Sequence, residues 1–182
     1  MKLLICSDIH GDLNAMENVL LAFRDEHADK ILILGDLLYH GPRNDLPEGY
    51  NPKGVIKLLN ENKNLILSVR GNCDTEVDQM VLEFPILADY AILELDGITV
   101  FATHGHHHNT ATPPPIMEGD ILLHGHTHVQ TITPFGDGNY YINPGSVSLP
   151  KENNPKTYAI YENRCFEIKA FDSKKTINKI QL

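Results

Sequence analysis

The sequence has few cysteines and no long hydrophobic run. Its three cysteines, Cys6, Cys73 and Cys165, are widely spaced, which is not the pattern of a disulfide framework and fits a reducing compartment. The apolar run at residues 3–6 ends at Ser7, so it is too short for the core of a signal peptide or for a membrane span. We therefore expect a cytoplasmic protein that does not bind a membrane.

Clusters of basic residues are also missing. The formal net charge is −9, and lysine and arginine form no run, which argues against stable binding to nucleic acid. The chain has no low-complexity tract and no internal repeat, and its 42% hydrophobic and 21% charged residues are typical of a globular protein. A length of 182 residues suits one compact core, so we expect a single domain over residues 1–182.

The first half of the chain alternates between apolar strands and amphipathic helices. Strands are predicted at residues 2–7, 30–34 and 65–69, and each ends at a polar loop. One helix is predicted after Asp12, which is a plausible N-cap, and another begins at Pro52. Strand, loop and helix in repetition indicate parallel strands joined by right-handed crossovers.

The second half is richer in strands. Residues 90–95 and 98–103 flank Asp96-Gly97, a strong hairpin signal. Further strands are predicted at 121–124, 129–135, 140–143, 158–162 and 166–171. The fold class predicted from this order is α/β, a four-layer α/β/β/α sandwich with two mixed sheets. The long segment 39–50 is predicted to be a loop that helps to form the functional site.

Five polar clusters follow predicted strands, and strand ends are where α/β sheets bind ligands. They are Asp8-Ile9-His10, Gly35-Asp36, Gly71-Asn72-Cys73-Asp74, Thr103-His104-Gly105-His106 and Gly125-His126-Thr127-His128. Neighbouring glycines allow sharp turns and close approach of the backbone. Taken singly, each cluster has an ordinary reading: a lone aspartate is often a helix cap, and a lone histidine is often a surface residue. Together they favour one shared site.

The donor atoms of these clusters suit transition metals. Two carboxylates, one amide and four imidazoles, without thiolate, favour Mn, Fe, Zn or Co over Mg or Ca. Seven ligands exceed the needs of one ion, whereas a carboxylate shared between two ions about 3.5–4 Å apart would use all seven. His126 and His128 have the i, i+2 spacing of residues on one face of a strand.

In this order, the five clusters resemble those of the calcineurin-like metallophosphoesterase superfamily. Gly41-Pro42-Arg43-Asn44 and Asn143-Pro144-Gly145-Ser146 further resemble its small YfcE-type bacterial phosphodiesterases. The resemblance implies two divalent ions, with Mn expected first and Ni, Fe, Co or Zn as alternatives, and a hydroxide between them as the nucleophile. It implies that Asp36 bridges both ions. The remaining ligands it implies are Asp8, His10 and His128 for one ion, and Asn72, His104 and His126 for the other.

The resemblance also implies roles in catalysis for Asp36, Asn72, Cys73 and His104. Cys73 departs from the wider superfamily, where many members have a histidine thought to protonate the leaving group; the thiol is either a weak acid or a small filler. Asp74 is then expected to be the N-cap of the following helix.

Substrate contacts are predicted at Arg43, Asn44 and Cys73. Arg43 either binds a phosphate oxygen or ties its loop down through Asp45 or Glu48. His106 is predicted to support the site, and His107 and His108 to face solvent.

The predicted function is hydrolysis of a small phosphodiester. The alternatives are a phosphomonoesterase that uses the same metals, and a non-catalytic interaction module like the Vps29-type retromer subunit. Because the chain lacks none of the ligands, the resemblance favours catalysis. A homo-oligomer that pairs through an edge strand near the C-terminus is an alternative to a monomer.

Overall fold

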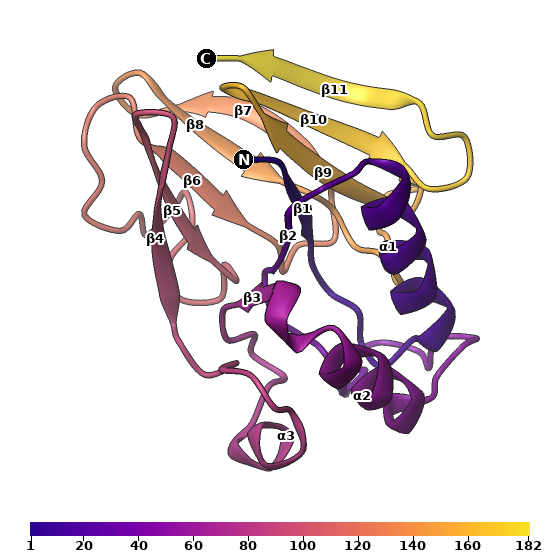
Figure 1. Ribbon diagram of the computed structural model, residues 1–182. Coiled ribbons are helices and arrows are strands. Elements are labelled where there is room, and N and C mark those ends of the chain that lie inside the picture. The colour runs from indigo at the N-terminus through magenta and orange to yellow at the C-terminus, as the bar shows by residue number, and fades with distance from the viewer.

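The fold is described from a computed structural model that covers residues 1–182. Two β-sheets face each other, with helices α1 and α2 beside the first sheet (Figure 1). In order across the first sheet, the strands are β11 (Thr176–Gln181), β10 (Cys165–Ala170), β9 (Thr157–Glu162), β1 (Leu3–Cys6), β2 (Lys30–Ile33) and β3 (Ile66–Ser68). β1, β2 and β3 are parallel, whereas β9, β10 and β11 are antiparallel to their neighbours.

The second sheet is also mixed. Its order is β4 (Tyr90–Leu95), β5 (Ile98–Thr103), β6 (Ile121–His124), β8 (Asn139–Asn143) and β7 (Thr131–Phe135). β5, β6 and β8 are parallel, and β4 and β7 are antiparallel edges. The predicted hairpin is present, because β4 and β5 pair around Asp96 and Gly97, which both have positive φ. The predicted α/β fold with two mixed sheets is confirmed.

The helices begin largely where the sequence predicts. α1 (Leu13–Asp25) is capped by the Asp12 carboxylate, which accepts a hydrogen bond from the Ala15 N–H at 3.1 Å. α2 (Pro52–Glu61) has proline in its first turn and Asn51 as its N-cap. A short 3₁₀ helix, η1 (Lys63–Leu65), precedes β3, and α3 (Glu76–Val81) follows it. None of the helices is long and apolar enough to cross a membrane.

The predicted N-cap of α3 is wrong. Thr75 is the N-cap, and it forms a capping box with Asp78. Asp74 is instead buried, and its carboxylate accepts hydrogen bonds from the backbone N–H groups of Asp36 and Leu37 in another loop and of Gly71 in its own loop. The sequence signal was ambiguous because Asp74 and Thr75 are both good capping residues, and only the tertiary contacts of Asp74 decide between them.

The core has two layers, one on each face of the first sheet. Leu4 and Cys6 point toward the helices, where they belong to a buried cluster that includes Met16 of α1 and Val55 of α2. Leu3 and Ile5 point the other way and belong to a second cluster with side chains of the second sheet. Because β1 is buried on both faces, its sequence is an unbroken apolar run.

One strand escaped sequence prediction. β11 pairs with β10 at the edge of the first sheet, with a register shift at Ile168/Lys169. Its sequence TINKIQ is mostly polar, and most of its side chains are exposed or half-buried. An edge strand with one partner needs little apolar surface, so the alternation that marks a strand is absent.

Candidate active site

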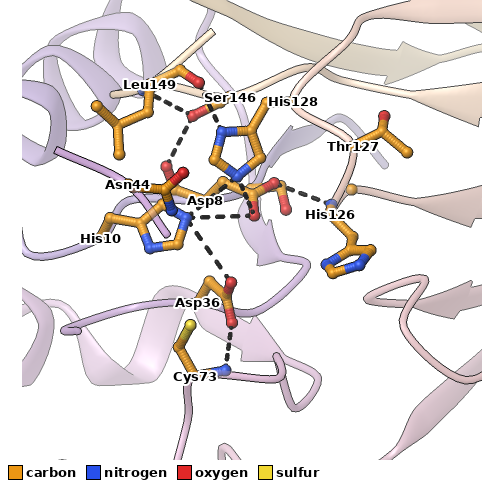
Figure 2. Close-up of polar contacts among 12 residues, drawn as sticks. Asp8, His10, Asp36, Asn44, Cys73, His126, Thr127, His128, Ser146 and Leu149 are labelled. Carbon is orange, nitrogen blue, oxygen red and sulfur yellow. Dashed lines mark hydrogen bonds and ion pairs between the residues drawn. The ribbon is translucent and has the colours of Figure 1, made fainter. Parts of the chain in front are cut away.

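The loops that follow five strands meet at one edge of the two sheets. Loops after β1, β2 and β3 come from the first sheet, and loops after β5 and β6 come from the second. Figure 2 shows side chains from the loops after β1, β2, β3 and β6 converging on a common centre. The structure brings together all seven predicted ligands: Asp8, His10, Asp36, Asn72, His104, His126 and His128. Five of the seven are almost fully buried, with Asn72 and His126 more exposed.

Four donor atoms form a first group. The Nε2 atoms of His10 and His128 are 3.2 Å apart. Asp8 Oδ1 lies 3.7 Å from His10 Nε2 and 3.3 Å from His128 Nε2. Asp36 Oδ2 is 3.7 Å from His10 Nε2.

A second group lies on the other side of Asp36. His104 Nε2 is 3.0 Å from Asn72 Oδ1 and 3.1 Å from His126 Nδ1. The same Asp36 Oδ2 that borders the first group is 3.4 Å from His104 Nε2. One carboxylate oxygen therefore borders both groups of donor atoms.

Hydrogen bonds orient three of the histidine rings. The Nδ1 atoms of His10, His104 and His128 lie 2.8, 2.6 and 2.6 Å from the backbone carbonyls of Tyr39, Leu34 and Leu149. A ring that donates from Nδ1 keeps a bare Nε2 lone pair in its neutral form. The facing Nε2 atoms of His10 and His128 then share no proton, and such an arrangement of lone pairs fits a cation.

Asp8 supplies an independent sign that a cation fits. Its Oδ2 accepts a hydrogen bond from the His126 N–H at 3.1 Å, but its buried Oδ1 has no hydrogen-bond partner. A buried acceptor without a partner is costly, and a divalent ion would satisfy it. The residues present therefore fit the divalent ions that this donor set predicts.

The charged groups of the site shift one another's pKa values. Burial alone would raise the pKa of Asp8, but His128, His104 and His10 outweigh it and hold that pKa well below its usual value. Burial lowers the pKa of His10 and of His126, which favours the neutral imidazole that a metal ligand requires. Burial also acts to lower the pKa of His104, but contact with Asp36 raises it to about 9, so an ion bound there at neutral pH would displace a proton.

Five of the predicted ligands have a left-handed backbone. Asp8, His10, Asp36, His126 and His128 all have φ between 50 and 67°, a left-handed conformation that costs roughly 1–2 kcal/mol for a residue with a side chain. The prediction that His126 and His128 share one face of a strand is therefore wrong. β6 ends at His124, and the left-handed residues turn the two rings to different groups.

Two glycines allow the loops to approach each other. A Cβ atom on Gly71 would lie 2.1 Å from Asp36 Oδ1, and one on Gly125 would lie 1.9 Å from the Ser7 hydroxyl oxygen. Neither glycine has positive φ, so lack of space explains both positions.

The loop after β8 supports the site from the second sheet. The hydroxyls of Ser146 and Ser148 donate to the Asp8 carbonyl at 3.0 and 2.8 Å. The Asn143 side-chain amide donates to the Gly125 carbonyl at 2.9 Å. The motif that contains Asn143 and Ser146 was recognised in the sequence, but its supporting role follows only from these contacts.

Asp74 locks two of the loops together. Its carboxylate accepts hydrogen bonds from the N–H groups of Asp36, Leu37 and Gly71 at 2.9, 2.9 and 2.7 Å. Burial raises the pKa of Asp74 to about 6, against the opposing effect of these donors. The carboxylate is therefore ionised at neutral pH and accepts all three bonds.

We expect Asp74→Asn to lower the free energy of unfolding by about 1–3 kcal/mol, because an amide nitrogen would face a buried N–H donor. The same change should weaken metal binding, since the Asp36 backbone loses its support. Urea denaturation and metal titration would measure the two effects. The matched control is Asp89→Asn, whose carboxylate makes no hydrogen bond or ion pair. Equal stabilities for the two variants would contradict the locking role.

The predicted substrate contacts lie beside the two groups. Arg43, Asn44 and Cys73 line one cavity together with His10, Asp36, Asn72, His126 and His128. Arg43 forms no ion pair with Asp45 or Glu48, so the alternative loop-anchoring role has no support in the structure. Asn44 instead anchors the loop, because its amide donates to the His40 carbonyl at 2.8 Å.

Lys151 also lines this cavity and was missed in the sequence. It lies two residues after Leu149, whose carbonyl orients His128, and no motif marks it.

For the three histidines after Gly105, the structure agrees with the predictions only in part. The His106 ring lies 5.4 Å from that of His104, and its buried Nδ1 has no partner. His107 is exposed. The His108 ring packs edge-on against Phe101 at 5.6 Å, so it is half-buried rather than fully solvent-facing.

Comparison with known proteins identifies the family of this chain. The family model of the calcineurin-like phosphoesterase superfamily domain matches residues 1–164. The chain belongs to this superfamily. It is 43% identical to phosphodiesterase YfcE of Escherichia coli strain K12 over 182 residues, which cover 100% of this chain and 98% of that protein. A solved structure of YfcE, described as a phosphoesterase from E. coli, superposes with a TM-score of 0.96 at 44% identity and covers 100% of this chain and 99% of that one.

A more distant structure shares only the fold. Vps29 of Entamoeba histolytica, solved in complex with zinc, has a TM-score of 0.60 at 18% identity, with 99% of this chain and 98% of that chain covered. The full-length similarity to YfcE and the superfamily match make this chain a metal-dependent phosphoesterase, a hydrolase acting on phosphoric ester bonds.

Proposed function

We propose that the protein is a phosphodiesterase that binds two divalent ions, one in each group of ligands. Asp8, His10 and His128 would hold the first ion, and Asn72, His104 and His126 the second. The observation that carries this proposal is the position of Asp36 Oδ2, which lies 3.7 Å from His10 Nε2 and 3.4 Å from His104 Nε2. When bound, two such ions supply a hydroxide nucleophile at neutral pH and compensate the charge that develops on the phosphate.

The residues of the chain orient the substrate and hold these positions. Asn72 and His104 place their oxygen and nitrogen 3.0 Å apart on the side of the second group. Arg43 and Lys151 provide positive charge on the wall of the cavity, where the guanidinium can pair with two phosphate oxygens. Water is restricted at the first group, because Asp8, His10 and His128 are almost fully buried.

Cys73 contributes little as an acid in this proposal. Burial and the neighbouring Asp36 carboxylate raise the pKa of its thiol far above the usual value. The backbone N–H of Cys73 donates to Asp36 Oδ1 at 2.8 Å, so this residue holds the bridging carboxylate through its main chain. Of the two predicted roles for the side chain, the proposal therefore favours a small filler between the loop and the sheet over a weak acid.

Manganese is the expected ion, with Ni, Fe, Co and Zn as alternatives. The donor set of imidazole, carboxylate and amide oxygen, without thiolate, is suited to these ions. We expect metal-stripped protein to be inactive toward bis-(p-nitrophenyl) phosphate and Mn to restore hydrolysis. Hydrolysis of p-nitrophenyl phosphate at a higher kcat/KM would instead favour a phosphomonoesterase. No hydrolysis with any of the five metals would contradict catalysis and favour an interaction module of the Vps29 kind.

The two histidines after β6 should bind different ions. His126 Nδ1 faces His104, whereas His128 Nε2 faces His10. Crystals grown with Mn are expected to show two anomalous peaks, one contacted by each ring. The control is a crystal of the Asp36→Asn variant, where one or both peaks should weaken. A single peak contacted by both rings would contradict the two-ion proposal.

Location and assembly stay predictions. The three cysteines form no disulfide, and a cytoplasmic location is part of the proposal. β11 is an edge strand with one pairing partner, so it is the segment through which copies of the chain would pair if the protein forms a homo-oligomer.

A further inference from the structure

A second cavity adjoins the one that holds the ligand groups. It is an apolar groove of about 410 Å³ between α2, α3 and the segment that contains Tyr39. We call it the apolar groove; its main lining residues are Tyr39, Tyr50, Ile56, Cys73, Val77 and Val81. Figure 1 shows α2 and α3 together at the lower side of the molecule, below β3. Cys73 lines both the groove and the cavity beside the metal ligands, so the two spaces adjoin at this residue.

The two spaces differ sharply in chemistry. The cavity beside the ligands carries Arg43 and Lys151 and is lined almost entirely by polar residues. The groove has one charged residue, Asp78, and its carboxylate already accepts hydrogen bonds from the Thr75 N–H and hydroxyl at 2.7 and 2.9 Å. The groove therefore offers no positive charge to an anion, and its mostly apolar lining suits a neutral apolar group.

The groove is exposed although it is apolar. Tyr39 is 42% exposed, Val77 68% and Val81 43%. Large apolar side chains that gather around a concave surface beside a catalytic site are typical of a pocket that binds part of a substrate. The Tyr39 backbone carbonyl also fixes the His10 ring, so one segment forms both the wall of the groove and a support of the site.

We propose that the substrates are phosphodiesters with one bulky, neutral, apolar ester group, aryl or alkyl, and that this group lies in the apolar groove while the phosphate lies at the ligand groups. This inference rests on the proposed function. The phosphate contacts the polar cavity, and the ester group passes Cys73 to reach Tyr39, Val77 and Val81.

The test is calorimetric binding of n-alkylphosphonates to the Mn-loaded protein. These compounds keep the anionic head and cannot be hydrolysed at their carbon–phosphorus bond. From methyl to hexyl, affinity should rise about two- to fourfold for each added methylene group. The heat capacity change of binding should become more negative along the series. Phenylphosphonate serves as the aryl probe: tighter binding than hexylphosphonate indicates an aryl substrate, and weaker binding indicates an alkyl one.

Two variants of α3 localise the effect. Val77→Asp places a charge in the groove, and we expect hexylphosphonate to bind it no more tightly than methylphosphonate. Met80→Asp is the matched control, because Met80 is 82% exposed on the same helix and does not line the groove. It should keep the full chain-length dependence. Both side chains are largely exposed, so neither change should prevent folding.

The outcomes separate the two proposals. Intact methylphosphonate binding with no gain along the series would overturn the groove assignment and leave the proposed function standing. Loss of methylphosphonate binding would contradict the metal site itself. If affinity rose equally along the series in the Val77→Asp and Met80→Asp variants, the alkyl group would bind elsewhere. That result would overturn the groove assignment. Sedimentation could also show that the parent protein is an oligomer and that Val77→Asp dissociates it. The groove would then be an interface between copies, and the groove assignment would be overturned.

Discussion

The Asp36→Asn variant is expected to lose at least about 10³-fold in kcat/KM toward bis-(p-nitrophenyl) phosphate, since a metal ion stabilises the transition state by several kcal/mol. Asparagine keeps the size of the side chain but loses the charge that two cations would share. Only Asp36 has an oxygen that lies within 3.7 Å of donors from both groups. Elemental analysis should therefore show that the variant has also lost one or both ions.

The matched control is Asp137→Asn. Asp137 lies in an exposed turn between β7 and β8, away from the site. This variant should keep parental activity and metal content. If both variants bound the same amount of metal and turned over substrate equally fast, Asp36 would not be a bridging ligand.

A second large effect is expected from the leaving group. General acid catalysis typically contributes about 10²–10⁴-fold, most where the leaving oxygen is basic. The buried Cys73 thiol has a raised pKa and is a poor proton donor at neutral pH. Aryl diesters should therefore be cleaved far faster than simple dialkyl diesters, and kcat/KM should fall steeply as the pKa of the leaving alcohol rises.

The Cys73→His variant should flatten this dependence, because an imidazolium can protonate the departing oxygen. The measurement is kcat/KM across diesters of graded leaving-group pKa but similar size, so that contacts in the apolar groove stay constant. Cys165→His provides the same substitution outside the site and should keep the steep dependence. A flat series in the parent protein would contradict this expectation and point to another acid, such as His106 or the Cys73 thiol itself.

The positions of the site residues could be predicted from the sequence because strand ends are marked by abrupt changes in polarity. Leu3 to Cys6 is wholly buried and is followed closely by Asp8 and His10, so the end of the strand and the start of the site coincide. The pairing of Ile98–Thr103 with Tyr90–Leu95 could also be predicted, because Asp96-Gly97 is a strong turn signal.

Contacts between distant loops could not be predicted. Whether Asp74 caps a helix or binds the N–H groups of Asp36 and Leu37 depends on a partner 37 or 38 residues away. The separation of His126 from His128 depends on left-handed backbone, which their i, i+2 spacing does not reveal. β11 carries too few apolar residues to mark a strand, and its identity depends on pairing with β10.

The origin of the ligands on both sheets has a consequence for the mechanics of the molecule. Asp8, Asp36 and Asn72 follow strands of the first sheet, whereas His104, His126 and His128 follow strands of the second. Ions held by both sets would link the two sheets at one edge of the sandwich. Any ligand that binds only the folded state adds to its stability, by about 2.7 kcal/mol at a free concentration of 100 times Kd. Loss of the ions would therefore loosen the two halves of the sandwich at the same edge where the chemistry takes place.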